Sequence, residues 1–319
     1  MKYVITGGAG FIGSNLVDEL VSQSHEVHVI DNFSFGKLEN CNKKAHYHNV
    51  DLSQISNFDQ IKNICRNADS VFHLACIARV QPSIENPIEY EMNNTIGSVN
   101  ILKASVQSNV RRFIYSSSSS VYGNQINLPL NEDFKTNPLS PYGAQKLYGE
   151  ILCKTFSKVY GLETVCLRYF NVFGKRQDPN GAYAAVIPKW VDSILNKKDV
   201  YINGDGKTSR DFCYVENAVQ MNILAATSNN KEAVNQVYNV ALNDRTSLYE
   251  LYNMIEERLI NKDLGITKKP PIYRDFREGD VRHSEANISK SKELLGYSPK
   301  YNISKGLDAY LDWFVKDIT

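Results

Sequence analysis

The sequence predicts an α/β protein built on a doubly wound parallel sheet. Three observations lead to this fold class. Short runs of β-branched and aromatic residues alternate with segments whose apolar residues recur at helical spacing. A glycine-rich turn joins the first such run to the first helical segment. The composition is that of a globular chain, with 42% hydrophobic and 22% charged residues among 319.

The first expected elements are a strand at 2–6, a helix beginning at Phe11 and a strand at 26–31. Further strands are expected at 46–50, 70–75, 112–116 and 164–168, and helices at 93–106 and 142–160. This alternation predicts one parallel sheet with ligands at the carboxyl ends of its strands. After Arg168 the pattern is less regular, with isolated helices around 186–196, 245–261 and 304–316.

The change of pattern predicts two regions. Residues 1–170, joined again by residues 212–242, are expected to form a nucleotide-binding domain. Residues 171–211 and 243–319 are expected to form a smaller α/β region that binds the substrate.

Bulk properties exclude several classes of function. The formal net charge of +1 gives no electrostatic reason to expect nucleic acid or a membrane surface as a partner. The six cysteines lack metal-ligand spacing, so no metal is expected. No run approaches the roughly 20 apolar residues of a membrane span, and the chain opens directly on a strand. We therefore expect a cytoplasmic protein.

The first turn carries glycines at 7, 10 and 13 between a strand and a helix. Glycine permits the tight turn and the close approach of backbone to a pyrophosphate, and the helix N-terminus offers N–H groups to the phosphates. Asp31 ends the next strand, where a carboxylate accepts hydrogen bonds from the adenosine ribose and repels a 2′-phosphate. No arginine follows in residues 32–36, so the sequence predicts NAD rather than NADP.

A second motif is Tyr142-x-x-x-Lys146, just inside a predicted helix that Ser140 caps and Pro141 opens. Positions i and i+4 share a helix face, so the ammonium lies near the phenol. The ammonium and the positive nicotinamide ring of the predicted NAD both favour the phenolate. Residues 116–120 are five consecutive serines at the end of the preceding strand. They can place a hydroxyl at the same edge of the sheet, which predicts a catalytic base with a hydrogen-bonding partner.

These motifs, together with Asp51-Leu52, His73-Leu74-Ala75 and residues 168–174, resemble those of the extended short-chain dehydrogenases/reductases of the NAD-dependent epimerase/dehydratase family. The resemblance covers the whole chain and implies a Rossmann fold. It implies that Ser118, Tyr142 and Lys146 form the catalytic triad. The cofactor-binding residues it implies are Gly7, Gly10, Phe11, Ile12, Gly13, Asp31, Asn32, Asp51, Leu52, Ala75, Tyr142, Lys146 and Tyr169.

The second half resembles the bacterial UDP-N-acetylglucosamine 4-epimerases in residues 176–190, 201–212 and 277–284. In that group the positions of Arg210 and Arg277 clamp the diphosphate and that of Asp280 holds the uridine ribose. The substrate-binding residues implied are Ala78, Ser118, Ser119, Ser120, Asn171, Gln177, Ala185, Val186, Lys189, Tyr201, Asn203, Arg210, Arg277, Asp280 and Ser284. Ala78 departs from the glycine usual in the group.

The resemblance also bears on the reaction. Related dehydratases carry Asp-Glu after their catalytic threonine, whereas Ser119 and Ser120 follow Ser118 here, which disfavours elimination. What remains is reversible oxidation at C4, so that UDP-N-acetylglucosamine and UDP-N-acetylgalactosamine interconvert through a 4-keto sugar. Ser284 occupies the position where a tyrosine would exclude an N-acetyl group.

Other functions stay open. They are a UDP-glucose/UDP-galactose 4-epimerase, a UDP-glucuronate decarboxylase or another sugar-nucleotide enzyme of this fold, and an NAD-binding regulatory protein. The family also implies a homodimer joined by a four-helix bundle. The candidate stretches are 93–106 and 148–159, with Ile96, Ile101, Ile151 and Phe156 available for burial.

Overall fold

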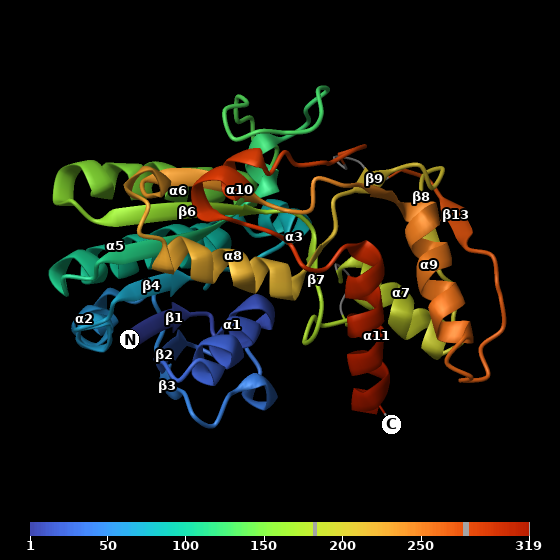
Figure 1. Cartoon of the computed structure of the whole chain (residues 1–319), viewed down its shortest axis with the longest axis horizontal. Coiled ribbons are helices and arrows are strands. Elements are labelled where there is room, and N and C mark those ends of the chain that lie inside the picture. The colour runs from blue at the N-terminus through green and yellow to red at the C-terminus, as the bar shows by residue number, and fades with distance from the viewer. Residues whose placement is uncertain (181–183, 277–280, 319) are drawn as a thin grey trace.

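The computed structural model describes residues 1–180, 184–276 and 281–318. Its main sheet has seven strands in the order β11-β6-β5-β4-β1-β2-β3 (Figure 1). All neighbouring pairs are parallel. The order reverses between β1 and β4, which is where a doubly wound sheet opens a crevice for its ligand. The strands are β1 Lys2–Thr6, β2 Glu26–Asp31, β3 His46–Asn49, β4 Ser70–His73, β5 Arg112–Ser118, β6 Glu163–Tyr169 and β11 Gln236–Val240.

Helices cover both faces of this sheet, so its strands are apolar on both sides. In β1, Tyr3 and Ile5 join the cluster on one face, while Val4 joins the cluster on the other. The first face is covered by α1 Phe11–Ser22, α8 Val215–Thr227 and α10 Ser289–Leu295, and the second by α2 Phe58–Cys65, α5 Gly97–Gln107 and α6 Pro141–Tyr160. The expected α/β class is confirmed.

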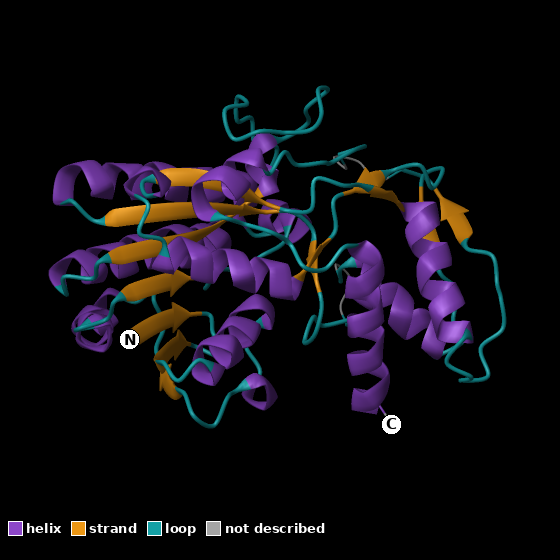
Figure 2. Cartoon of the chain, viewed as in Figure 1, coloured by secondary structure: helices purple, strands orange, loops and turns teal. Residues whose placement is uncertain are grey.

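A third apolar cluster lies beside the carboxyl end of the sheet, where Figure 2 shows mostly helices and short strands. It is built from α7 Val186–Leu195, α9 Leu248–Ile260 and α11 Ile303–Ile318 around Phe173 and Tyr214. The strand pairs here are β7 Val172–Phe173 with β10 Cys213–Tyr214, β8 Tyr201–Asn203 with β13 Ile272–Arg274, and β9 Ser209–Arg210 with β12 Thr246–Ser247.

The remaining helical elements are short. They are α3 Val80–Glu85, α4 Pro87–Glu91, the π-helical η3 Met92–Ile96, and the 3₁₀ turns η1 Leu38–Asn40, η2 Ile55–Asn57, η4 Ser119–Tyr122 and η5 Lys231–Ala233. The division into two regions stays a prediction. Residues of α10 pack on the main sheet with the cluster that contains Tyr3, whereas those of α9 and α11 pack in the third cluster.

Two expected elements differ from the structure. The helix expected over 93–106 starts as the π-helical segment η3 and becomes α-helical only at Gly97. The strand expected over 70–75 ends at His73. The reason is that the Ala75 amide donates to the Thr6 hydroxyl at 3.1 Å instead of continuing the ladder of backbone hydrogen bonds.

A buried ion pair ties together β5, β6 and α6. The Arg168 guanidinium donates from Nε and Nη2 to the two oxygens of Glu150, at 2.9 and 2.8 Å. The hydroxyl of Ser117 donates to the same carboxylate at 2.5 Å. Both charged side chains are only 5–6% exposed. A charge buried to this extent is tolerated only with its partner in place.

We predict that Glu150→Gln lowers the free energy of unfolding by about 3–5 kcal/mol, because it leaves the Arg168 charge buried without its counter-ion. The measurement is the midpoint of urea unfolding, with Glu257→Gln as control. Glu257 is exposed on α9, and its replacement is expected to change the free energy of unfolding by less than about 0.5 kcal/mol. Equal midpoints for the two variants would contradict the prediction.

Candidate active site

The predicted catalytic residues lie at the carboxyl edge of the sheet. Ser118 ends β5, and Tyr142 and Lys146 lie on the first two turns of α6. The helix starts as the sequence predicts, because Ser140 Oγ accepts a hydrogen bond from the Gly143 amide at 3.1 Å and Pro141 is the first helical residue. A Cβ at Gly143 would lie 2.9 Å from the backbone oxygen of Ser120, so glycine permits this helix end to approach η4, the turn that follows β5.

The Ser118 hydroxyl lies close enough to the Tyr142 phenol to interact with it. Ser118 Oγ accepts from the Ser120 amide at 3.2 Å and from the Ser120 hydroxyl at 2.9 Å. Burial raises the pKa of the Tyr142 phenol above its ordinary value, and the interaction with Ser118 offsets part of this rise. The protein alone therefore favours a neutral phenol at Tyr142.

Lys146 lies against the same group of side chains. Its ammonium is 5.8 Å from the centre of the Tyr142 ring and donates to the backbone oxygen of Ser116 at 2.7 Å. The side chain is nearly fully buried, with an exposure of 4% for the residue. The Ser116 hydroxyl lies 3.2 Å from the hydroxyl of Tyr169, at the end of β6. The structure thus brings together four residues that the sequence singled out on β5, α6 and β6.

The glycine turn has the geometry of a dinucleotide site. Gly7 has a φ of 71°, and a Cβ there would lie 2.7 Å from the Ala75 amide. A Cβ at Gly13 would lie 2.2 Å from the carbonyl oxygen of Gly7, so the start of α1 packs directly on the turn. Gly10 differs, because only the oxygen of Gly7 lies within 4 Å of an added Cβ. No side chain caps α1, so its first turn, which begins at Phe11, fits a pyrophosphate.

Asp31 lies at the end of β2 and is 8% exposed. Its carboxylate accepts the Ala9 amide and the Phe33 amide, both at 2.9 Å. Asn32, the next residue, accepts the Ser34 amide in a short turn. Asp31 therefore joins the glycine turn to the loop after β2, a structural task that the motif did not predict. The carboxylate remains at the strand tip where a ribose would bind.

The remaining expected cofactor residues line the adjacent strand ends. Asp51 lies two residues past β3 and accepts the amide and hydroxyl of Ser53, at 2.8 and 2.7 Å. Leu52 is 7% exposed, and its carbonyl accepts the side-chain amide of Asn100. Ile12, at the start of α1, packs against the third apolar cluster.

A hydrogen-bonded chain that sequence reasoning missed supports this region. Ser98 donates to the Asn94 oxygen at 2.5 Å, so it accepts the proton on Nε2 of His73, 2.9 Å away. His73 Nδ1 then accepts from the Thr6 hydroxyl at 2.7 Å, and Thr6 accepts the Ala75 amide. Burial lowers the pKa of His73 to about 3, which matches this neutral tautomer. His73 supports the turn and carries no positive charge near neutral pH.

The expected substrate residues come from seven places along the chain. Ser119 and Ser120 follow β5, and Asn171 and Gln177 flank β7. Ala185 and Val186 form the start of α7, with the exposed Lys189 one turn on. Tyr201 and Asn203 belong to β8, Arg210 ends β9, and Ala78 is exposed ahead of α3. Arg277 and Asp280 lie outside the described residues.

Hydrogen bonds place two of these residues side by side. The Ser284 amide donates to the oxygen of Ser209 at 3.1 Å. Arg210 Nη1 donates to the backbone oxygens of Ser209 and Arg282, at 3.0 and 3.3 Å. Ser284 is buried, with an exposure of 9%.

The described ranges 1–180, 184–276 and 281–318 contain no group of three His, Cys, Asp or Glu side chains placed to hold a metal ion. Within the same ranges, no helix has the length and hydropathy required to cross a bilayer.

Residues 3–241 match the model of the NAD dependent epimerase/dehydratase family. The chain belongs to this family. It is similar to the solved UDP-N-acetylglucosamine 4-epimerase of Methanobrevibacter ruminantium in complex with UDP-N-acetylmuramic acid (40% identity, TM-score 0.91, 99% of this chain and 98% of that one). It is also similar to the Thermotoga maritima UDP-glucose 4-epimerase solved with UDP-glucose (35% identity, TM-score 0.92, 100% of both chains). A UDP-glucose 4-epimerase of Mycolicibacterium smegmatis is 31% identical over 326 residues, covering 98% of each chain.

Proposed function

We propose that this member of the family is an NAD-dependent UDP-sugar 4-epimerase, and that it interconverts UDP-N-acetylglucosamine and UDP-N-acetylgalactosamine. The observation that carries the proposal is the contact between the Ser118 hydroxyl and the Tyr142 phenol beside the buried Lys146. Solved neighbours of 35–40% identity are named as UDP-sugar 4-epimerases, which supports the same reaction class for this chain.

The residues of the triad have separate tasks. Tyr142 Oη accepts the proton of the sugar 4′-hydroxyl, and Ser118 Oγ hydrogen-bonds the same sugar oxygen. Lys146 contributes a positive charge near the phenol. Bound NAD would supply the hydride acceptor and donor at C4, together with a positive charge beside the phenol. After the 4-keto sugar has turned its other face, Tyr142 returns the same proton, so the reaction needs no external acid or oxidant.

The raised pKa of Tyr142 has a consequence for this scheme. Burial disfavours the phenolate, and Lys146 lies 5.8 Å from the ring centre while its ammonium is hydrogen-bonded to Ser116. Ionisation of Tyr142 therefore depends on charge that arrives with the bound cofactor. In the absence of cofactor, the phenol is expected to stay protonated and unreactive at neutral pH.

Two features support epimerisation of an N-acetylated sugar. Ser119 and Ser120 offer hydroxyls where an elimination reaction would need an acid and a base. Ser284 offers a small side chain at the position proposed to lie beside the 2-substituent of the sugar, where a ring would occupy the space of an acetamido group. The Methanobrevibacter neighbour was solved with a sugar nucleotide that carries an N-acetyl group.

We predict that Tyr142→Phe retains fold and NAD content but loses at least about a hundredfold in kcat, because a general base contributes 10²–10⁴-fold. Ser118→Ala is expected to lose less, because only a hydrogen-bonding partner disappears. The measurement is turnover of a panel of UDP-sugars with chromatographic separation of the 4-epimers. Near wild-type turnover by the phenylalanine variant would exclude Tyr142 as the base. Wild-type protein that epimerises none of the UDP-sugars would exclude the proposed function.

We predict that Ser284→Tyr lowers kcat/KM for the two N-acetylated substrates by roughly ten- to a hundredfold, because overpacking costs about 1–3 kcal/mol. Turnover of UDP-glucose and UDP-galactose is expected to be retained. The measured quantity is the ratio of the two specificity constants, since a general folding defect lowers both. Ser291→Tyr serves as a matched control, because Ser291 is buried on α10, outside the proposed sugar site. An unchanged ratio would mean that Ser284 does not line the sugar pocket.

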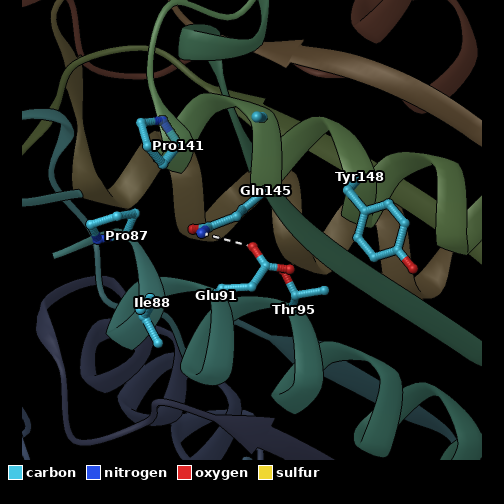
Figure 3. A pocket seen from close by; sticks show the side chains of 8 residues that line it. Pro87, Ile88, Glu91, Thr95, Pro141, Gln145 and Tyr148 are labelled. Atoms are coloured by element: carbon cyan, nitrogen blue, oxygen red, sulfur yellow. Dashed lines mark hydrogen bonds between the residues drawn. The ribbon is translucent and has the colours of Figure 1, made fainter. Parts of the chain in front are cut away.

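The proposal includes assembly of two copies through helices α4, η3 and α6. A groove of about 420 Å³ runs between these helices, lined by Pro87, Ile88, Glu91, Thr95, Pro141, Ala144, Gln145 and Tyr148 (Figure 3). Apolar side chains are exposed along this face, with Ile88 at 79% and Ile151 at 53%. Such a face suits the self-complementary contact of a twofold dimer.

The sequence-based choice of contact residues needs one correction. Ile101 was expected at the dimer contact, but it is fully buried in the core of its own subunit, between α5 and the sheet. Phe156 also packs partly against that cluster. The helical period places Ile101 on the face of α5 that covers the sheet. A residue on that face cannot contact a second copy of the chain.

We predict a homodimer at micromolar concentration that Ile88→Glu together with Ile151→Glu converts to a monomer, because two charges would be buried in each half of the contact. Light scattering coupled to gel filtration measures the mass. The matched control is Ile55→Glu, at a position that is 76% exposed on η2 and does not line the groove. A wild-type monomer, or an unchanged dimer in the double variant, would contradict the assembly.

A further inference from the structure

Asp211 lies between β9 and β10, where the chain passes from the third apolar cluster back toward the main sheet. It is fully buried. Its carboxylate accepts four backbone amides, those of Leu242 at 2.9 Å, Asn243 at 3.0 Å, and Asp244 and Ala286 at 3.3 Å. A carboxylate bonded in this way is charge-assisted at every contact, which fixes the chain segments around it.

These amides come from two distant segments. Leu242 to Asp244 follow β11, the edge strand of the main sheet, whereas Ala286 follows Ser284 by two residues. The backbone oxygen of Asp211 also accepts the side-chain amide of Asn171 at 3.2 Å. One residue thus contacts the chain on both sides of the proposed sugar site.

The neighbouring strand reinforces this arrangement. Arg210 directly precedes Asp211 in the chain. The backbone of Ser209 pairs with the segment that holds Ser284. The Ser209 amide donates to the backbone oxygen of Arg282 at 3.1 Å, and the Ser284 amide donates to the backbone oxygen of Ser209 at 3.1 Å. The Asp211 carboxylate accepts the Ala286 amide and so holds the same segment two residues beyond Ser284. The relative placement of Arg210 and Ser284 therefore depends on the carboxylate of Asp211.

We infer that Asp211 is a positioning residue for UDP-sugar binding, which holds the arginine expected on the diphosphate and the serine expected beside the sugar in one fixed arrangement. The inference rests on the proposed function. It assigns Asp211 no contact with substrate or cofactor. The consequence is that loss of the carboxylate weakens ground-state and transition-state binding alike, while the triad on β5 and α6 is undisturbed.

The test is Asp211→Asn in the NAD-loaded enzyme. The amide has the size of the carboxyl group, but its NH₂ opposes at least one of the four backbone amides. We expect the Kd for UDP, measured by calorimetry, and the KM for the UDP-sugar to rise about tenfold or more. The kcat and the NAD released on denaturation are expected to stay within about twofold of wild type. Equal UDP affinity in variant and wild type would overturn the inference.

The control is Glu256→Gln, which makes the same chemical change at a buried carboxylate on α9. Glu256 accepts the Tyr252 hydroxyl at 2.6 Å and the Lys269 amide at 2.8 Å, and neither partner belongs to the proposed site. The control is expected to keep the wild-type UDP affinity. An equal loss in both variants would mean a general structural effect and overturn the inference. A wild-type protein that binds no UDP would instead overturn the proposed function.

A measurement on the wild type covers the case in which Asp211→Asn does not fold. Burial raises the pKa of Asp211 to about 7, although its four amide partners lower it. Protonation removes acceptor capacity, so the KM is expected to be constant above pH 8 and to rise roughly tenfold between pH 8 and pH 6, since only about a tenth of the group is ionised one unit below its pKa. A KM that stays constant from pH 8 down to the lowest pH at which the protein remains folded would overturn the inference.

Other groups around Asp211 must be separated from it in that measurement. Burial raises the pKa of the Cys213 thiol on β10 and of the Tyr297 phenol after α10 well above neutral, so both stay uncharged. His283 contacts Ser209 at 2.8 Å, and burial lowers its pKa below 6.5, with Arg245, Arg282 and Arg210 nearby. The dependence of KM on pH is expected to persist in His283→Gln. If the pH dependence of KM disappeared in His283→Gln, it would belong to the histidine, and the inference would be overturned.

Discussion

Glu150 and Arg168 meet in the interior behind the triad, where neither charge could remain without the other. Ser117, their third partner, precedes Ser118 on β5, and Arg168 precedes Tyr169 on β6. Glu150 lies one turn beyond Lys146 on α6. Every group of this network is thus a close neighbour of a residue at the carboxyl edge. The bidentate contact links α6 to the paired strands β5 and β6, and these three elements carry Ser118, Tyr142, Lys146 and Tyr169.

The sequence predicted those parts of the molecule that local chemistry determines. The strands at 2–6 and 26–31 and the start of α6 at Pro141 agree with the structure because alternation, glycine and the Ser140 cap act over a few residues. A serine hydroxyl beside Tyr142 was also predictable, since residues 116–120 end a strand at the edge where the helix begins. The glycine turn and Asp31 were predicted from local pattern, whereas the choice of Ser118 and of the substrate residues came from family resemblance. The roles of these residues remain proposals.

What the sequence could not show depends on partners far away along the chain. Asp211 meets amides that are 31 to 75 positions distant, and no local pattern marks it. The inward orientation of Ile101 follows from packing against the sheet, which periodicity alone leaves undecided. The sequence predicted that Lys146 and the nicotinamide ring together favour the phenolate of Tyr142, but it could not show how strongly the phenol is desolvated. In the protein alone, burial raises the pKa of Tyr142, and the Lys146 ammonium is hydrogen-bonded to the backbone of Ser116.

The edge strand β11 has a consequence for how this chain is made. Strands β1 to β6 are complete at residue 169, yet the partner that covers β6 is formed by residues 236–240. During translation, the backbone N–H and C=O groups on the β11 side of β6 therefore remain unpaired until about seventy more residues have been added. At 5–20 residues per second this interval lasts several seconds. An apolar open edge is a template for wrong pairing, so the nascent chain is most exposed to aggregation or to chaperone capture in this interval.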